Sequence, residues 1–153
     1  MTRIKQIGHI VLFVRDVAAS AAWYCEVLGM ERVTAHRGIP AVFLSFGRRD
    51  HDIALFQVRD GRDLGHHDAE HFAFEIEGGL DALKAFKARL EETGVTITGI
   101  VDHGISYGIY FLDPDGHQLE VFHQRVRPDE AAKRRFAEIG VMGVPVDLNA
   151  VEN

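Results

Sequence analysis

The chain has 153 residues, of which 46% are hydrophobic and 26% are charged, and its formal net charge is −6. This length and balance suit one soluble globular domain, or two short similar halves fused into one. An acidic chain does not suit nucleic acid or an anionic membrane as a partner. No segment approaches the roughly 20 apolar residues of a membrane span, and the apolar run at residues 7–14 does not resemble a signal peptide.

Cysteine and histidine usage narrows the class further. Cys25 is the single cysteine, so an internal disulfide is excluded and a reducing cytoplasm is the expected compartment. Histidine is frequent, with nine residues and no His-tract. Because imidazole is the commonest transition-metal ligand in proteins, this count draws attention to a metal site.

The first half begins with a strand-like run at residues 8–14, which carries His9 in its second position. A helix is predicted to follow, with Asp16 as its N-cap and Gly29 as its stop. Three further strands are predicted at residues 31–35, 41–46 and 51–58.

The second half repeats this order. A strand-like run at residues 70–76 carries His71 in its second position, and a helix with Leu83, Phe86 and Leu90 on one face ends before Gly94. Three strands are again predicted, at residues 96–101, 106–112 and 117–123. The last two are joined by the tight turn Asp-Pro-Asp-Gly at residues 113–116.

Both halves therefore read βαβββ, which predicts an α+β fold. We expect one domain, residues 1–153, in which module 4–58 and module 69–124 pair across a pseudo-twofold axis into a cupped mixed sheet. Residues 59–68 are polar and turn-rich and serve as the linker. Residues 128–153 form a C-terminal helix, stopped by a glycine, and a tail that packs either on the domain or on a partner subunit.

Three side chains at matched positions predict a metal site. His9 and His71 begin equivalent strands, and strand parity puts His71 on the face opposite Phe72. Glu120 lies on the last strand, pointing the same way. Each residue alone is more simply explained as a structural histidine or a solvated acid, but a carboxylate in a dry sheet interior is costly unless a cation binds it. Two imidazoles and one carboxylate leave open coordination positions, which suits Fe(II) or Mn(II).

These features resemble the vicinal-oxygen-chelate superfamily, which includes glyoxalase I, fosfomycin-resistance enzymes, bleomycin-binding proteins and type I extradiol dioxygenases. The resemblance covers residues 4–124 and rests on Gly-His-Ile at 8–10, the segment 23–29 and Asp-Pro-Asp-Gly at 113–116. Many branches share these motifs, so they imply the fold more than the reaction.

The stretch 101–120 is more specific, because it fits the extradiol ring-cleavage signature of a His, an aliphatic-Tyr pair, Asp-Pro-x-Gly and a ligand Glu. Residues 49–55 also resemble the dioxygenase segment that supplies an active-site His. The resemblance implies three iron ligands, His9, His71 and Glu120, and three catalytic groups, His51, His103 and Tyr110. It further implies a catechol-type diol and O2 as substrates and a homo-oligomeric assembly.

Other branches fit less well. Aligning the halves puts Ala54 opposite Glu120, so the first-half carboxylate of glyoxalase I is missing. Bleomycin-type binders need no ligand triad, and fosfomycin-type enzymes need no equivalent of His51, His103 and Tyr110. Two alternatives stay open: another metal-dependent enzyme, such as an isomerase, epimerase or thiol transferase, and a module that binds a small molecule without turnover.

Several of these residues also have a purely structural explanation. His103 can cap a turn before Gly104, and Tyr110 can be a half-buried strand aromatic. His117 and His123 are predicted to be surface residues.

Overall fold

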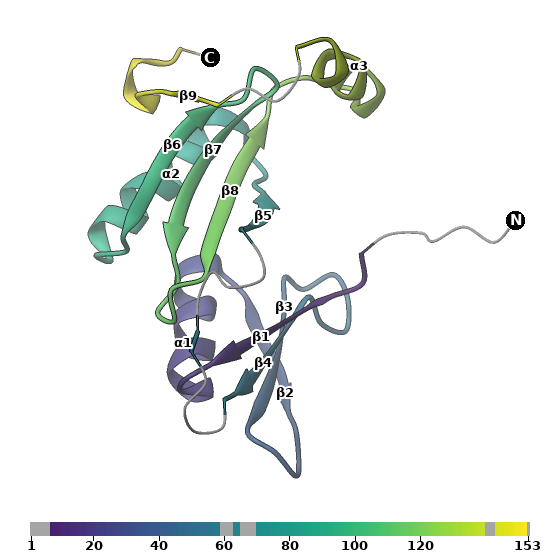
Figure 1. Ribbon diagram of the computed structural model, residues 1–153, viewed down its shortest axis with the longest axis vertical. Helices are drawn as coiled ribbons and strands as arrows, with labels where there is room; N and C mark the ends of the chain where they lie inside the picture. Colours follow the sequence, from purple (N-terminus) through teal and green to yellow (C-terminus); the bar gives the residue numbers. More distant parts are fainter. Residues whose placement is uncertain (1–6, 59–62, 65–69, 140–142, 153) are drawn as a thin grey trace, which may run out of the picture. The chain divides into compact units, whose positions relative to one another are not determined.

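The computed structural model describes residues 7–58, 63–64, 70–139 and 143–152 (Figure 1). The chain divides into two compact units, Met1–Leu64 and Gly65–Asn153, called here the N-terminal and C-terminal modules. Each is described by itself. Across the described ranges, no helix has the length and apolar character needed to cross a bilayer.

The N-terminal module is a four-stranded mixed sheet with one helix. Its elements are β1 (Ile10–Val14), α1 (Val17–Leu28), β2 (Glu31–Ala35), β3 (Ala41–Ser45) and β4 (Ile53–Gln57). The strand order is β1-β4-β3-β2, with β1 parallel to β4 and the other neighbours antiparallel. The sequence predicted this order of elements, and the strand bounds differ from the prediction only at their ends.

Helix α1 forms where the sequence provides both of its caps. The Asp16 carboxylate accepts hydrogen bonds from the backbone N–H groups of Ala18 and Ala19, which satisfies two of the donors left over at a helix start. Gly29 ends the helix with φ of 69°, a conformation that glycine adopts without strain. Between the caps, Tyr24 is fully buried against the sheet together with Val14 of β1.

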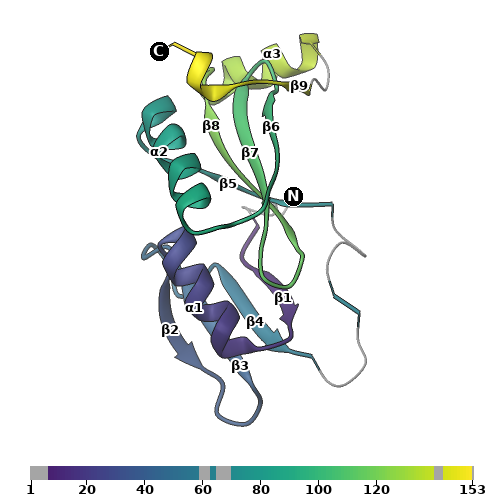
Figure 2. The ribbon, with the colours of Figure 1, turned by 90° about the vertical axis from the view of Figure 1, so that its left-hand side faces the viewer.

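The C-terminal module repeats the arrangement. Its elements are β5 (Phe72–Glu75), α2 (Gly79–Glu92), β6 (Ile97–Asp102), β7 (Ser106–Leu112) and β8 (Gln118–Gln124), with β5 parallel to β8. Helix α2 lies along one face of the sheet, as Figure 2 shows. Its residues Leu83 and Leu90 are fully buried, and Phe86 meets Phe111 of β7 edge-on at 5.7 Å between ring centroids. The predicted apolar stripe of this helix is thus its core face.

The strand registers of the two modules correspond. Val11 of β1 pairs with Ala54 of β4, and Ala73 of β5 pairs with Glu120 of β8. Ala54 therefore occupies in the first module the register position that Glu120 occupies in the second. This confirms the alignment of the two halves that the sequence predicted.

The chain ends on its own C-terminal module. Helix α3 (Asp129–Ile139) follows β8, and β9 (Val144–Pro145) then adds an antiparallel strand to β6, which makes the sheet five-stranded. The 3-10 turn Leu148–Ala150 follows β9, and its Leu148 is fully buried. Lys84 Nζ of α2 donates a hydrogen bond to the carbonyl of Val151 at 2.6 Å. Of the two alternatives for the tail, packing on the domain is the one observed.

The α+β class and both βαβββ modules are confirmed. The pairing of the modules into one cupped sheet stays a prediction, because each module is described separately. Most of the predicted linker, 59–62 and 65–68, and the glycine predicted to stop α3, Gly140, lie outside the described residues.

Candidate metal centre

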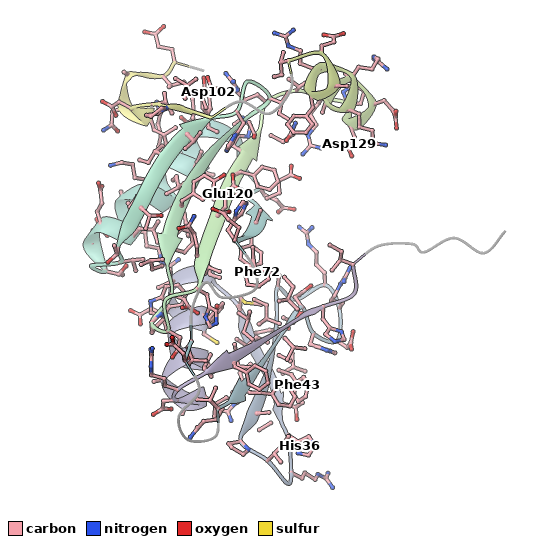
Figure 3. The ribbon with its side chains drawn as sticks, in the orientation of Figure 1. His36, Phe43, Phe72, Asp102, Glu120 and Asp129 are labelled. Atoms are coloured by element: carbon pink, nitrogen blue, oxygen red, sulfur yellow. The ribbon has the colours of Figure 1, made fainter. Side chains whose placement is uncertain are left out.

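The C-terminal module presents one sheet face to α2 and the other to the candidate ligands. Leu119 and Phe111 lie on the α2 face and are fully buried. Glu120 and Tyr110 are register partners across β8 and β7, and strand alternation places both on the opposite face. Figure 3 labels Glu120 on β8. The parity argument from sequence therefore holds for this carboxylate.

His71 and Glu120 face each other across two strands. His71 Nε2 lies 3.2 Å from Glu120 Oε2, and the glutamate is only 6% exposed. The other ring nitrogen, Nδ1, contacts the Glu70 carboxylate. An acid at Nδ1 is the usual partner of a metal-binding histidine, because it accepts the Nδ1 proton when Nε2 binds a metal. Two electron-rich groups directed at one point form a good position for a cation.

A second pair of groups adjoins the same carboxylate. His103 Nε2 is 2.9 Å from the hydroxyl oxygen of Tyr110 and 3.7 Å from Glu120 Oε1. Burial raises the pKa of the Tyr110 phenol, and the negative charge of Glu120 raises this pKa further. Tyr110 is therefore a neutral hydroxyl at physiological pH, able to donate a hydrogen bond.

The turn before β7 does not need His103 as its cap. The backbone N–H of Gly104 donates instead to the Asp102 carboxylate at 2.6 Å. The His103 ring contacts Tyr110 through Nε2, and the alternative of a turn-capping histidine stays open.

The N-terminal module gathers a separate cluster of rings. The centroids of the His9 and His51 rings lie 4.5 Å apart, and Phe43 of β3 meets His51 edge-on at 5.3 Å. His51 Nδ1 is 2.8 Å from the Asp50 carboxylate, and this hydrogen bond lowers the pKa of Asp50. The ring orientation of His51 is thus set by the acid that precedes it, as with His71.

The predicted site residues therefore form two groups. His71, Glu120, His103 and Tyr110 come together in the C-terminal module. His9 and His51 come together in the N-terminal module. Within the described part of each module, no three His, Cys, Asp or Glu side chains make a complete ligand set by themselves. The joining of His9 to His71 and Glu120 in one metal site stays a prediction.

Three contributors were not identified from sequence. Glu70 and Asp50 each hold the Nδ1 of the histidine that follows them, and the repeated acid-His dipeptide was the available signal. Gly108 of β7 lies beside the Glu120 carboxylate, where a Cβ would be 3.1 Å from the carboxyl carbon and closer still to Oε1. A single glycine inside a strand pattern can mark such a close approach.

The prediction that His117 is a surface residue was wrong, whereas His123 is partly exposed. His117 is 9% exposed, and its Nδ1 lies 2.8 Å from the Asp113 carboxylate inside the turn between β7 and β8. His123 is half-buried, and its pKa is lowered by burial and then by the positive charge of Arg125. His117 therefore supports the turn between β7 and β8 rather than the candidate site.

The family model of the Glyoxalase/Bleomycin resistance protein/Dioxygenase superfamily matches residues 6–121. This match covers most of the chain and spans both βαβββ modules. The protein belongs to this superfamily, as its repeat and its registers indicate.

Two curated relatives differ in chemistry. Biphenyl-2,3-diol 1,2-dioxygenase 2 of Rhodococcus globerulus is 28% identical over 135 residues, covering 86% of this chain and 70% of that protein. Glutathione transferase FosA of Serratia marcescens is 31% identical over 120 residues, covering 77% of this chain and 80% of that protein. The chain spans as little as 39% of the length of another dioxygenase relative.

A solved structure supports the same fold. An integron cassette protein from the mobile metagenome of V. cholerae matches with a TM-score of 0.62 and 27% identity, covering 80% of this chain and 98% of that one. Its description carries no activity. The superfamily is therefore established, and the choice of reaction depends on the side chains of the site.

Proposed function

We propose that this protein is an Fe(II)-dependent extradiol dioxygenase that cleaves the ring of a catechol-type diol. The metal ligands are His9, His71 and Glu120, and Mn(II) is the alternative metal. The observation that carries the proposal is the 2.9 Å hydrogen bond between His103 and Tyr110, formed beside the buried Glu120 carboxylate. Holding a metal does not use this pair, whereas a diol bound beside the metal offers oxygens with which the Tyr110 hydroxyl can form a hydrogen bond.

The residues present fit a divalent metal. Two imidazole nitrogens and one carboxylate oxygen form the ligand type associated with non-haem Fe(II), and the acid on His71 Nδ1 is the usual support for a metal-binding histidine. A metal held by His9, His71 and Glu120 would supply Lewis acidity, which would lower the pKa of the diol hydroxyls.

The chain's own side chains handle the diol and its protons. Tyr110, kept neutral by its raised pKa, donates a hydrogen bond to a diol oxygen, and His103 orients the Tyr110 hydroxyl. His51, held at Nδ1 by Asp50, presents Nε2 as a proton acceptor and later as a donor. In the net reaction, a ring carbon–carbon bond next to the diol breaks and both atoms of O2 enter the product. No external reductant is needed.

The dioxygenase relatives support this choice of substrate class, since one of them is a biphenyl-2,3-diol 1,2-dioxygenase. The FosA relative favours a second candidate, a metal-dependent thiol transferase. That reaction shares the need for a metal but not the need for O2. The two candidates are therefore separable by oxygen consumption.

The decisive experiment loads the protein anaerobically with Fe(II) and then adds air and a panel of catechols that includes biphenyl-2,3-diol. We expect O2 uptake together with a yellow ring-opened product. A parallel anaerobic assay with Mn(II), glutathione and fosfomycin tests the second candidate. If no catechol supports O2 uptake and glutathione is consumed in the parallel assay, the second function replaces the first.

We further propose a homo-oligomer in a reducing cytoplasm. All five residues of the edge strand β2 are exposed, and an uncovered strand edge favours association with another chain. The single Cys25 fits a compartment without disulfides. Light scattering during size-exclusion chromatography measures the assembly directly, and a monomeric mass at working concentration would contradict it.

A further inference from the structure

The C-terminal module contains a hollow of about 350 Å³ between α3 and the sheet face that carries Glu120. Its apolar lining comes from Phe122 of β8, Phe136 and Ala132 of α3, and Ile105. Ala132 and Phe136, four residues apart, form an apolar side of α3 that lines the hollow. This side faces a cavity instead of a packed core, since no residue of this helix is buried.

The hollow lies over the same sheet face as the candidate metal centre, and its lining contains none of the proposed ligands or catalytic groups. Phe122 follows Glu120 by two residues, so both side chains lie on one face of β8, about 7 Å apart along the strand. Glu75 lines the hollow and shares a face of β5 with Ala73 and the position of His71. A ligand held near Glu120 and His71 could therefore extend toward α3.

The charges around the hollow are paired with one another. Arg127 binds both the Glu75 and the Asp129 carboxylates, and Lys133 Nζ lies 3.1 Å from the Glu130 carboxylate. Opposite charges thus balance at the rim, while two phenylalanine rings line the interior. An ionic ligand would have to compete with these pairs, whereas a neutral aromatic group would gain contact with both rings.

We propose that the hollow under α3 binds an aryl substituent of the diol ring, which makes Phe122 and Phe136 specificity-determining residues. This inference rests on the proposed ring-cleavage function and narrows its substrate class to aryl-substituted diols. The volume lies at the lower end of the range for small-molecule pockets, which suits one further ring. α3 lies outside residues 6–121, the region that the family model matches.

The test compares kcat/KM for catechol and for biphenyl-2,3-diol in Phe136→Ser. We expect a loss of about tenfold for the biaryl substrate, as for one lost aromatic contact, and a change of less than about twofold for catechol. Phe46→Ser is the matched control, since Phe46 is 40% exposed in the other module and Phe136 is 42% exposed. It should change neither substrate. Equal losses for both substrates in Phe136→Ser would overturn the inference.

A second variant covers the case in which Phe136→Ser displaces α3. Ala132→Phe adds a ring to the lining and should exclude the aryl group while keeping catechol turnover. Unchanged selectivity in Ala132→Phe would overturn the proposal.

Binding separates this inference from the proposed function. Calorimetric titration of the Fe(II)-loaded protein with biphenyl-2,3-diol under argon does not depend on turnover, because O2 is excluded. We expect binding that weakens about tenfold in Phe136→Ser, even if no catechol is cleaved and the ring-cleavage function fails. Equal or absent binding in both proteins would overturn the inference. So would loss of the oligomer in Phe136→Ser with diol binding unchanged, which would assign the hollow to a subunit contact.

Discussion

The carboxylate of Glu120 lies against Gly108 of the neighbouring strand, in the space that the Cβ atom of any other residue would occupy. An ideal Cβ at position 108 would be 3.1 Å from the carboxyl carbon and within hard contact of Oε1. β7 carries larger side chains on either side of this point, including Tyr107 and Ile109. A side chain at position 108 would push Glu120 away from His71. Because Gly108 has no side chain, the buried Glu120 carboxylate can pack directly against the backbone of β7.

Gly108→Ala is therefore expected to weaken Fe(II) or Mn(II) binding about 10- to 100-fold, the range seen when the support of a metal ligand is lost. Overpacking should also cost about 1–3 kcal/mol of stability. Gly99→Ala is the matched control, because Gly99 lies on the adjacent strand β6, opposite Tyr110, and a methyl group there would meet no atom within 4 Å. Metal titration followed by elemental analysis measures the difference. Equal affinities in the two variants would contradict the role of Gly108.

Glu70→Ala and Asp50→Ala should have different effects, although each removes the acid beside a histidine Nδ1. His71 is a proposed ligand, so loss of Glu70 should lower metal affinity about 10- to 100-fold. His51 is a proposed proton carrier, so loss of Asp50 should leave the metal content unchanged and lower kcat. Each of the two variants serves as the control for the other. A fall in metal content in Asp50→Ala would make His51 part of the metal site.

His103→Ala and Tyr110→Phe are expected to lower kcat by about 10²- to 10⁴-fold, the usual contribution of a positioned proton donor or acceptor. Their Fe(II) content should stay near that of the unchanged protein, since neither side chain is a proposed ligand. Rates of O2 uptake with biphenyl-2,3-diol and iron analysis of the same samples provide both quantities. Iron loss in both variants would show that the pair supports the metal instead of the diol.

The sequence predicted the repeat because its signals are local and occur twice. Asp16 and Gly29 mark the ends of α1, and strand alternation around Glu120 separates its face from that of Leu119. The correspondence of Ala54 with Glu120 also followed from aligning two short apolar runs, and the registers confirm it.

The remaining features depend on which strands lie beside each other, and a single sequence does not reveal this. The contact of Gly108 with Glu120 exists only in the observed register of β7 and β8. His117 was misassigned because its partner, Asp113, is brought to it by the folded turn. The hollow under α3 likewise needs the path of the chain after β8, which periodicity does not specify.

Metal removal tests the proposed ligand set as a whole, including His9, the proposed ligand from the N-terminal module. A metal at a free concentration of 100 times its Kd adds about 2.7 kcal/mol to the free energy of unfolding. This raises Tm by about 5–10 °C in a chain of this size. Chelation should therefore lower Tm, and Fe(II) or Mn(II) should restore it. His9→Ala, His71→Ala and Glu120→Ala should each abolish the metal-dependent rise in Tm, because each variant removes one proposed ligand.

Two histidines outside the proposed triad serve as controls. His36 lies in the loop after β2, where its Nδ1 accepts hydrogen bonds from the backbone N–H groups of Gly38 and Ile39. Replacing His36 by Ala should not change the metal-dependent rise in Tm. His51→Ala should also keep the full rise in Tm while losing turnover. A metal-dependent rise that persists in His9→Ala but not in His71→Ala would place the whole metal site within the C-terminal module, because the remaining ligands would then suffice without the first half.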